Sequence, residues 1–233
     1  MFKPSRKITL NEADHKYELR GSEHIEFKSV TTCISEYFKE FDKVKIATNL
    51  KQRSPKYRHL TIEEIIDSWD KSAQFGTDVH KEIEDYINHR KKPTIDRSSM
   101  AIKWLNNYLM KSDFDLFSET IVYCEKLKLA GTIDLLLYDK INNIYSIIDW
   151  KTSKKIDTVG YRNKTGNKPE TEDLLDTNFN HYSLQLSLYR YLLEKNYSIK
   201  IKDQIIVHIS DDSVHSYLTD NLNAHILSIL KHY

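Results

Sequence analysis

Residues 131–151 of the chain read GTIDLLLYDKINNIYSIIDWK, two apolar runs separated by a short polar stretch. Runs of this length, broken at Lys140–Asn143, predict two antiparallel strands joined by a hairpin turn. Since the start of one strand in a hairpin meets the end of the other, we expect Asp134 to lie beside Asp149. Lys151 is expected on the same face as Asp149, because side chains two residues apart along a strand point the same way.

Three charged groups at neighbouring strand ends need a physical reason, because a buried carboxylate is costly unless it is paired or binds a metal. A divalent cation between two aspartates lets both stay ionised, and oxygen ligands favour Mg²⁺ or Mn²⁺. A lysine beside the metal can orient a water or stabilise charge on a phosphate. The alternative is a plain ion pair of Lys151 with Asp134 or Asp149 at a sheet edge.

The rest of the chain predicts helices around one mixed sheet. Residues 7–32 alternate apolar and polar side chains and predict a hairpin, or a pair of short strands, with its turn at Arg20–Ser22. Apolar residues at helical spacing predict a helix over 72–90. The other predicted elements are helices over 33–70 with a break near Ser54–Pro55, a helix over 98–111, strands at 116–126, 132–139 and 143–150, an irregular stretch over 153–179, a helix over 180–195, strands at 204–209 and 213–218, and a C-terminal helix. This order predicts an α/β fold with a mixed central sheet flanked by helices.

Composition excludes several classes of protein. With 39% apolar residues in 233 the chain can bury a sizeable core, and a formal net charge of +1 gives no overall attraction to a polyanion or a membrane. The two cysteines, Cys33 and Cys124, are expected to be reduced thiols, too few for a four-thiolate metal site. No run of about 18 apolar residues predicts a membrane span, and the N-terminus lacks the apolar core of a signal peptide. We therefore expect a cytoplasmic protein, in a bacterial or phage-infected cell.

The motifs in 131–152 resemble a known family. Gly131-Thr-Ile-Asp134, followed by an apolar strand that ends Asp149-Trp-Lys151-Thr, is similar to the RecB-like branch of the PD-(D/E)xK nuclease superfamily. Phe75-Gly-Thr-Asp-Val-His80 resembles the G-x-x-x-H helix of that branch, and Gln185 with Tyr189 resembles its Q-x-x-x-Y motif. The resemblance implies a restriction-endonuclease-like core of order α-β-β-β-α-β.

The resemblance also implies roles for single residues. His80, Asp134, Asp149 and the carbonyl of Trp150 would ligate Mg²⁺ or Mn²⁺. Asp134, Asp149, Lys151 and Gln185 would form the catalytic set, in which Lys151 positions a water and Gln185 holds Lys151 or the scissile phosphate. Taken alone, a helical histidine is more often a surface or core residue than a ligand. Glu119 resembles an upstream acid of the family, with a solvated glutamate at a strand end as the alternative.

Lys28-Ser-Val-Thr-Thr32 adds a narrower resemblance, to the entry segment of the mitochondrial genome maintenance exonucleases and their phage relatives. That group implies a substrate of single-stranded DNA or DNA ends. We expect a single nuclease domain over 1–233. Its expected parts are an N-terminal elaboration (1–70), a catalytic core (71–210) and a C-terminal strand and helix (211–233).

Two basic clusters, residues 39–59 and 151–168, stand out from the neutral background. Solvated surface is the alternative for any single lysine, but as clusters they predict contacts with a phosphate backbone. The predicted substrate-binding residues are Lys51, Arg53, Lys154, Lys155 and Tyr189. We therefore expect a metal-dependent deoxyribonuclease, an exonuclease on single strands or ends, with possible protein partners in replication or recombination. The alternatives are a structure-specific or restriction-type endonuclease and a non-catalytic DNA-binding module.

Overall fold

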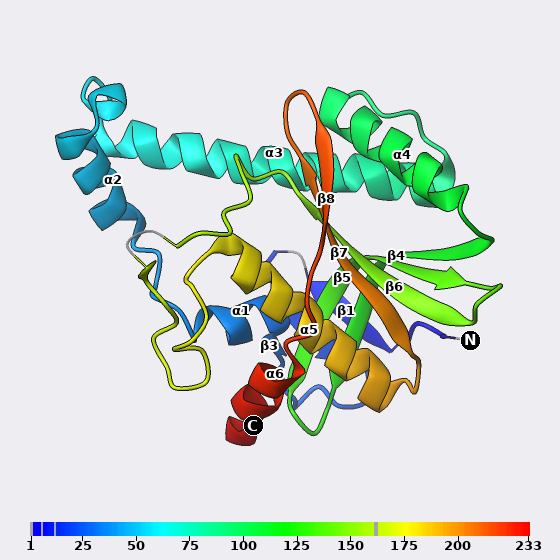
Figure 1. Cartoon of the computed structure of the whole chain (residues 1–233). Helices are drawn as coiled ribbons and strands as arrows, with labels where there is room; N and C mark the ends of the chain where they lie inside the picture. The colour runs from blue at the N-terminus through cyan, green and yellow to red at the C-terminus, as the bar shows by residue number, and fades with distance from the viewer. Residues whose placement is uncertain (1, 6, 12, 161–162) are drawn as a thin grey trace.

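The computed structural model of the chain describes residues 2–5, 7–11, 13–160 and 163–233, and its elements are drawn in Figure 1. An N-terminal hairpin precedes a region of helices, a mixed sheet and a C-terminal helix. The elements are β1 (Ile8–Asn11), β2 (Lys16–Leu19), β3 (Lys28–Ser29), α1 (Val30–Ser35), α2 (Lys43–Arg53), the 3₁₀ helix η1 (Pro55–Tyr57), α3 (Ile62–His89), α4 (Asp96–Leu109), β4 (Phe114–Cys124), β5 (Leu129–Asp139), β6 (Ile144–Lys151), α5 (Asn178–Asn196), β7 (Ile201–Ile209), β8 (Val214–Leu218), α6 (Asn223–Ile229) and η3 (Leu230–His232).

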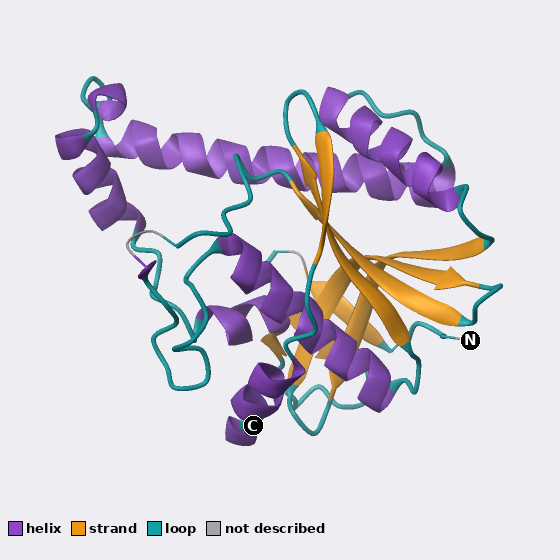
Figure 2. Ribbon diagram, viewed as in Figure 1, coloured by secondary structure: helices purple, strands orange, loops and turns teal. Residues whose placement is uncertain are grey.

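The predicted α/β fold class is confirmed: helices lie on both faces of a six-stranded mixed sheet (Figure 2). β5 pairs antiparallel with β4 and with β6, and it pairs in parallel with β3. β6 and β7 also pair in parallel and are joined through α5. One apolar layer packs α3 and α4 against residues such as Leu135, Ile148 and Trp150. The second layer packs α1, α5 and α6 against the other face of the sheet, around residues such as Leu136 and Ile147.

One side of β5 lacks a strand partner over a short stretch. β4 pairs with this strand along its length. On the opposite side, β3 pairs with Leu129 and Ala130, and β6 pairs with Leu135 to Asp139. In the part of the chain that the structure describes, residues 131–134 have no strand partner on that side. This opening leaves the Asp134 side chain and the end of β6 accessible to side chains from the helices.

Helix α3 is longer than predicted, because it begins at Ile62 rather than near residue 72. Its N-terminus is fixed by a capping box, in which Thr61 accepts from the Glu64 N–H and the Glu64 carboxylate accepts from the Thr61 N–H. The helix packs on the sheet through Val79 and Ile83, while its N-terminal half extends past the sheet to α2 (Figure 1).

One turn was predicted wrongly. The N-terminal hairpin pairs Asn11 with Lys16, so its turn lies between these residues and not at Arg20–Ser22. His15 takes a left-handed conformation there with φ of 55°, which closes the tight turn. Both cysteines are free, as predicted. Within the described residues, no helix combines the length and the apolar character that crossing a membrane would require.

Candidate metal centre

Asp134 and Asp149 lie where the pairing of β5 with β6 ends. The last pair of the register is Leu135 with Ile148, so each aspartate is the next residue on its strand. Asp134 Oδ2 accepts a hydrogen bond of 2.8 Å from the backbone N–H of Trp150. The predicted hairpin and the approach of Asp134 to the end of β6 are therefore confirmed. The predicted role of the Trp150 carbonyl as a ligand stays a prediction.

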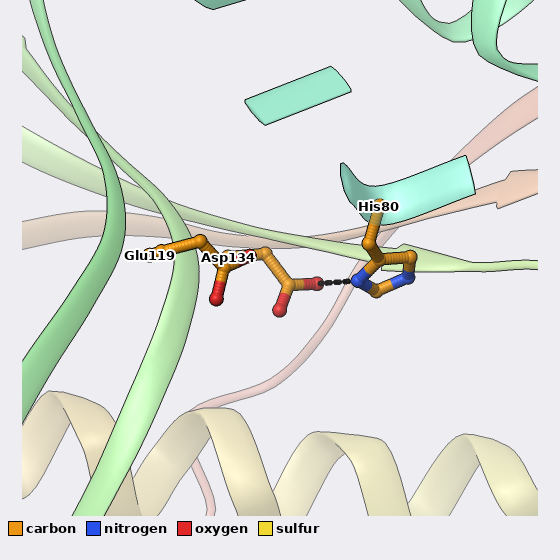
Figure 3. A group of neighbouring side chains, drawn as sticks. All are labelled: His80, Glu119 and Asp134. Carbon is orange, nitrogen blue, oxygen red and sulfur yellow. Dashed lines mark ion pairs between the residues drawn. The ribbon is translucent and has the colours of Figure 1, made fainter. Parts of the chain in front are cut away.

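Three side chains from different elements converge at this opening: His80 of α3, Glu119 of β4 and Asp134 of β5. They point toward one another in Figure 3. One potential ligand atom of each lies within 4.8 Å of the others. His80 Nδ1 and Asp134 Oδ2 are 3.6 Å apart, and all three residues are partly buried. The predicted approach of His80 and Glu119 to Asp134 is confirmed, although Asp149 is not part of this triad.

Glu119 has an unusual backbone and an unusual acidity. Its φ of 44° is left-handed within a strand, where a non-glycine residue is strained. The strain lies at the residue whose side chain enters the triad. Burial, and then the charge of Asp134, raise the pKa of Glu119 to about 8. Without a cation, the site therefore favours a proton on this carboxyl.

Asp149 and Lys151 form a buried ion pair beside the triad. Lys151 Nζ lies 2.5 Å from Asp149 Oδ2, and only 4% of the aspartate side chain is exposed. Burial raises the pKa of Asp149, although Lys151 opposes the shift. Burial alone would lower the pKa of Lys151, but the charges of Asp149 and Asp134 outweigh it and raise the pKa. Lys151 therefore stays protonated at neutral pH.

Gln185 and Tyr189 of α5 support the aspartates from the other layer. Gln185 Nε2 donates to Asp149 Oδ1 at 3.3 Å, a contact that was not predicted. Its predicted role in holding Lys151 or the scissile phosphate stays a prediction. Tyr189 is 3% exposed, which corrects its predicted role in substrate binding. Its ring lies over Gly131, where a Cβ atom would stand 2.6 Å from the ring. Gly131 is thus needed for α5 to approach the opening.

A pocket of about 280 Å³ lies beside the ion pair. Its lining comes from α3, from the end of β6 with the residues that follow, and from α5. The lining includes Gly76, Thr77, His80, Lys151, Thr152 and Tyr182. The Lys151 amine lies 4.6 Å from the centroid of the Tyr182 ring, which forms one wall. Tyr182 was not predicted, although its position three residues before Gln185 places both on one helix face.

The two basic clusters lie at different distances from the triad. Lys51 and Arg53 end α2, which packs on the N-terminal part of α3. Lys51 Nζ donates to the Leu60 carbonyl at 2.5 Å and so holds the chain reversal before α3. Its predicted contact with a phosphate backbone stays a prediction. From Ile62 to His80, an α-helix rises about 27 Å. The first cluster therefore does not border the triad directly.

The second cluster begins at the site. Lys154 and Lys155 are exposed and follow β6 within four residues of Lys151. Lys155 pairs with Asp157 at 2.6 Å on this surface. Tyr161 and Arg162, also within this cluster, lie outside the described residues. The predicted contacts of Lys154 and Lys155 with a phosphate backbone stay predictions.

Comparisons with known proteins add little. No family model matches the chain, and no curated protein matches it. Among solved structures the chain is similar to SSO0001, known from a crystal structure, with 15% sequence identity and a TM-score of 0.39. The match covers 88% of this chain and 71% of that one. At this level of likeness, neither a fold nor an activity is carried over from that protein.

Proposed function

We propose that the protein is a metal-dependent deoxyribonuclease that hydrolyses phosphodiester bonds at single-stranded DNA or DNA ends. One observation carries the proposal: the triad of His80, Glu119 and Asp134 lies next to the buried ion pair of Asp149 and Lys151. Ligands for a hard cation and a protonated amine are thus available at one opening of the sheet. The resemblance of these motifs to RecB-like nucleases supports the same reaction.

The residues fit a divalent cation such as Mg²⁺ or Mn²⁺. Glu119 and Asp134 supply oxygen atoms and His80 a nitrogen, a set that suits Mn²⁺ and Mg²⁺ better than softer metals. The raised pKa of Glu119 indicates that the acids here lack enough positive charge to keep all of them ionised. Asp149 is balanced separately, by the Lys151 ammonium at 2.5 Å from its Oδ2. The positive charge of a bound cation would lower the pKa of Glu119 and let this acid ionise beside Asp134.

When bound, a divalent ion would polarise the scissile phosphate and lower the pKa of a water. The side chains of the protein supply the remaining functions. Asp149 holds the Lys151 amine in place, and the amine stabilises negative charge that develops on the phosphate. Gln185 orients Asp149 through the second carboxylate oxygen. Lys154 and Lys155, which follow β6 in the chain and are exposed, would attract the phosphate backbone of the strand.

End-labelled linear DNA and circular DNA, single- and double-stranded, test the proposal in Mg²⁺, Mn²⁺ or EDTA. We expect cleavage of linear single strands that needs the metal and that D134N and D149N abolish. D115N is the matched control, since Asp115 lies four residues before Glu119 at the far end of β4 and pairs with Lys140. Cleavage of circles would favour the endonuclease, and DNA binding without cleavage the non-catalytic module. Cleavage by D134N at the wild-type rate would contradict the proposed metal site.

A further inference from the structure

The chain directly after Lys151 is held by two side chains from separate elements. Arg97, in the first turn of α4, donates from Nη1 to the Thr152 carbonyl at 3.0 Å. His208 of β7 lies 2.6 Å, through Nε2, from the Ser153 carbonyl. Since a carbonyl only accepts, Nε2 must carry the proton in this contact. Two consecutive carbonyls are thus bound by donors from two separate elements, α4 and β7.

The other hydrogen bonds of this segment lie further along it. Asn178 of α5 donates to the Lys155 carbonyl and accepts from the Asp157 N–H, both at 2.8 Å, and Ser153 Oγ donates to the Lys155 carbonyl at 3.2 Å. β6 ends at Lys151, and the described residues that follow, up to α5, form no named strand. The segment is also a wall of the pocket next to the proposed site. Thr152 packs so closely on α3 that a Cβ atom at Gly76 would stand 2.7 Å from its hydroxyl. A small shift of the segment would therefore change both the pocket and the direction of Lys151.

The donors are themselves fixed. The remaining guanidinium nitrogens of Arg97 contact Asp211, and its Cζ atom lies 5.2 Å from the centroid of the Phe75 ring. The arginine side chain is only 18% exposed, whereas Asp211 is 92% exposed. His208 is 6% exposed and pairs in register with Lys151 across the parallel strands. Its side chain is therefore on the same sheet face as the lysine.

We propose that Arg97 and His208 are positioning residues that fix Thr152 and Ser153, and through them the Lys151 amine. The expected effect on kcat rests on the proposed nuclease function. The expected effect on the position of Thr152 and Ser153 does not. Neither residue belongs to the triad, and neither contacts Asp149 or Asp134 in the described structure. Their removal should misplace the amine without removing a metal ligand.

Four variants test this. H208L removes the donor at similar volume, and H208Q keeps an N–H donor near the position of Nε2. R97M removes the guanidinium but keeps an unbranched apolar side chain against Phe75. D211N is the matched control, because it removes the charge that pairs with Arg97 and leaves the bond to Thr152.

We expect H208L and R97M to lower kcat roughly 10- to 100-fold, since a displacement of about 1 Å at a reacting group can have this effect. KM and the Mn²⁺ dissociation constant should stay within about twofold of wild type. H208Q should restore most of the rate, and D211N should match wild type. A merely structural role would lower the melting temperature without this separation of kcat from metal affinity.

Hydrogen–deuterium exchange of residues 152–156 in the metal-free protein gives a measure that needs no activity. H208L and R97M should speed exchange in this segment about tenfold, and D211N should not. If the wild type neither binds Mn²⁺ nor cleaves DNA while exchange rises as expected, the positioning role holds and the nuclease proposal fails. Unchanged exchange, together with kcat within twofold of wild type in H208L and R97M, would overturn the positioning role.

Discussion

Substitution of Glu119 by glutamine should stabilise the metal-free protein. Burial and the charge of Asp134 raise the pKa of this carboxyl from 4.5 to about 8, so the folded state retains a proton that the unfolded chain releases. The buried carboxyl therefore lowers the free energy of unfolding. This loss is absent below about pH 4.5, grows as the pH rises, and levels off above about pH 8. Glutamine is neutral at every pH and removes this loss.

The magnitude follows from the shift in pKa. At about 1.4 kcal/mol per pH unit, the loss at pH 7 is at most roughly 3 kcal/mol. Because the side chain is only partly buried, solvent screening reduces this to about 1–2 kcal/mol. For a domain of this size, the melting temperature of E119Q should exceed that of wild type by roughly 2–8 °C at pH 7.

Differential scanning calorimetry in EDTA at pH 5, 6, 7 and 8 measures this. The gain in melting temperature should increase over the series, and E125Q, at an exposed position in the turn after β4, should show none. Saturating Mn²⁺ should then stabilise the wild type more than E119Q, because a ligand that binds only the folded state adds stability. A gain that is independent of pH, or a loss of stability in E119Q, would refute the assigned environment of Glu119.

Four further outcomes are expected. K151A should lose cleavage but keep its Mn²⁺ affinity in calorimetric titration, because the amine is not a metal ligand; retained turnover would remove it from the reaction. H80A should lose more activity in Mg²⁺ than in Mn²⁺, since Mg²⁺ demands more regular geometry, and equal losses in steady-state assays would contradict ligation. Charge reversal of Lys154 and Lys155 should weaken single-strand binding and flatten its salt dependence by a slope of roughly 0.7 per lost phosphate contact; an unaltered slope would place the strand elsewhere. G131A should lower the melting temperature by several degrees, because the tyrosine ring over this position must move, and an unchanged thermal transition would contradict this packing.

The sequence carries much of the site but less of its surroundings. The positions of Asp134 and Asp149 were predictable, because a hairpin with a two-residue side-chain period fixes which residues meet. The start of α3 was not, because the helix between residues 67 and 78 is mostly exposed and shows no apolar periodicity there. Its N-terminus depends instead on the capping box at Thr61.

Long-range polar contacts were beyond prediction for a different reason. The bond from Arg97 to the Thr152 carbonyl joins residues far apart in sequence, and no local pattern distinguishes this arginine from a solvated one. The contact of Lys51 with the Leu60 carbonyl depends likewise on how the chain reverses before α3. Tyr189 was assigned to substrate binding because the Q-x-x-x-Y motif places it one helical turn after Gln185, whereas Gly131 leaves room for the whole ring to be buried.

Anomalous diffraction from crystals soaked in Mn²⁺ tests the metal centre most directly. We expect one strong peak within about 2.5 Å of ligand atoms from His80, Glu119 and Asp134, and its loss in D134N crystals. A peak at another place on the protein, or none at saturating Mn²⁺ in a crystal whose triad is open to solvent, would contradict the proposed metal centre.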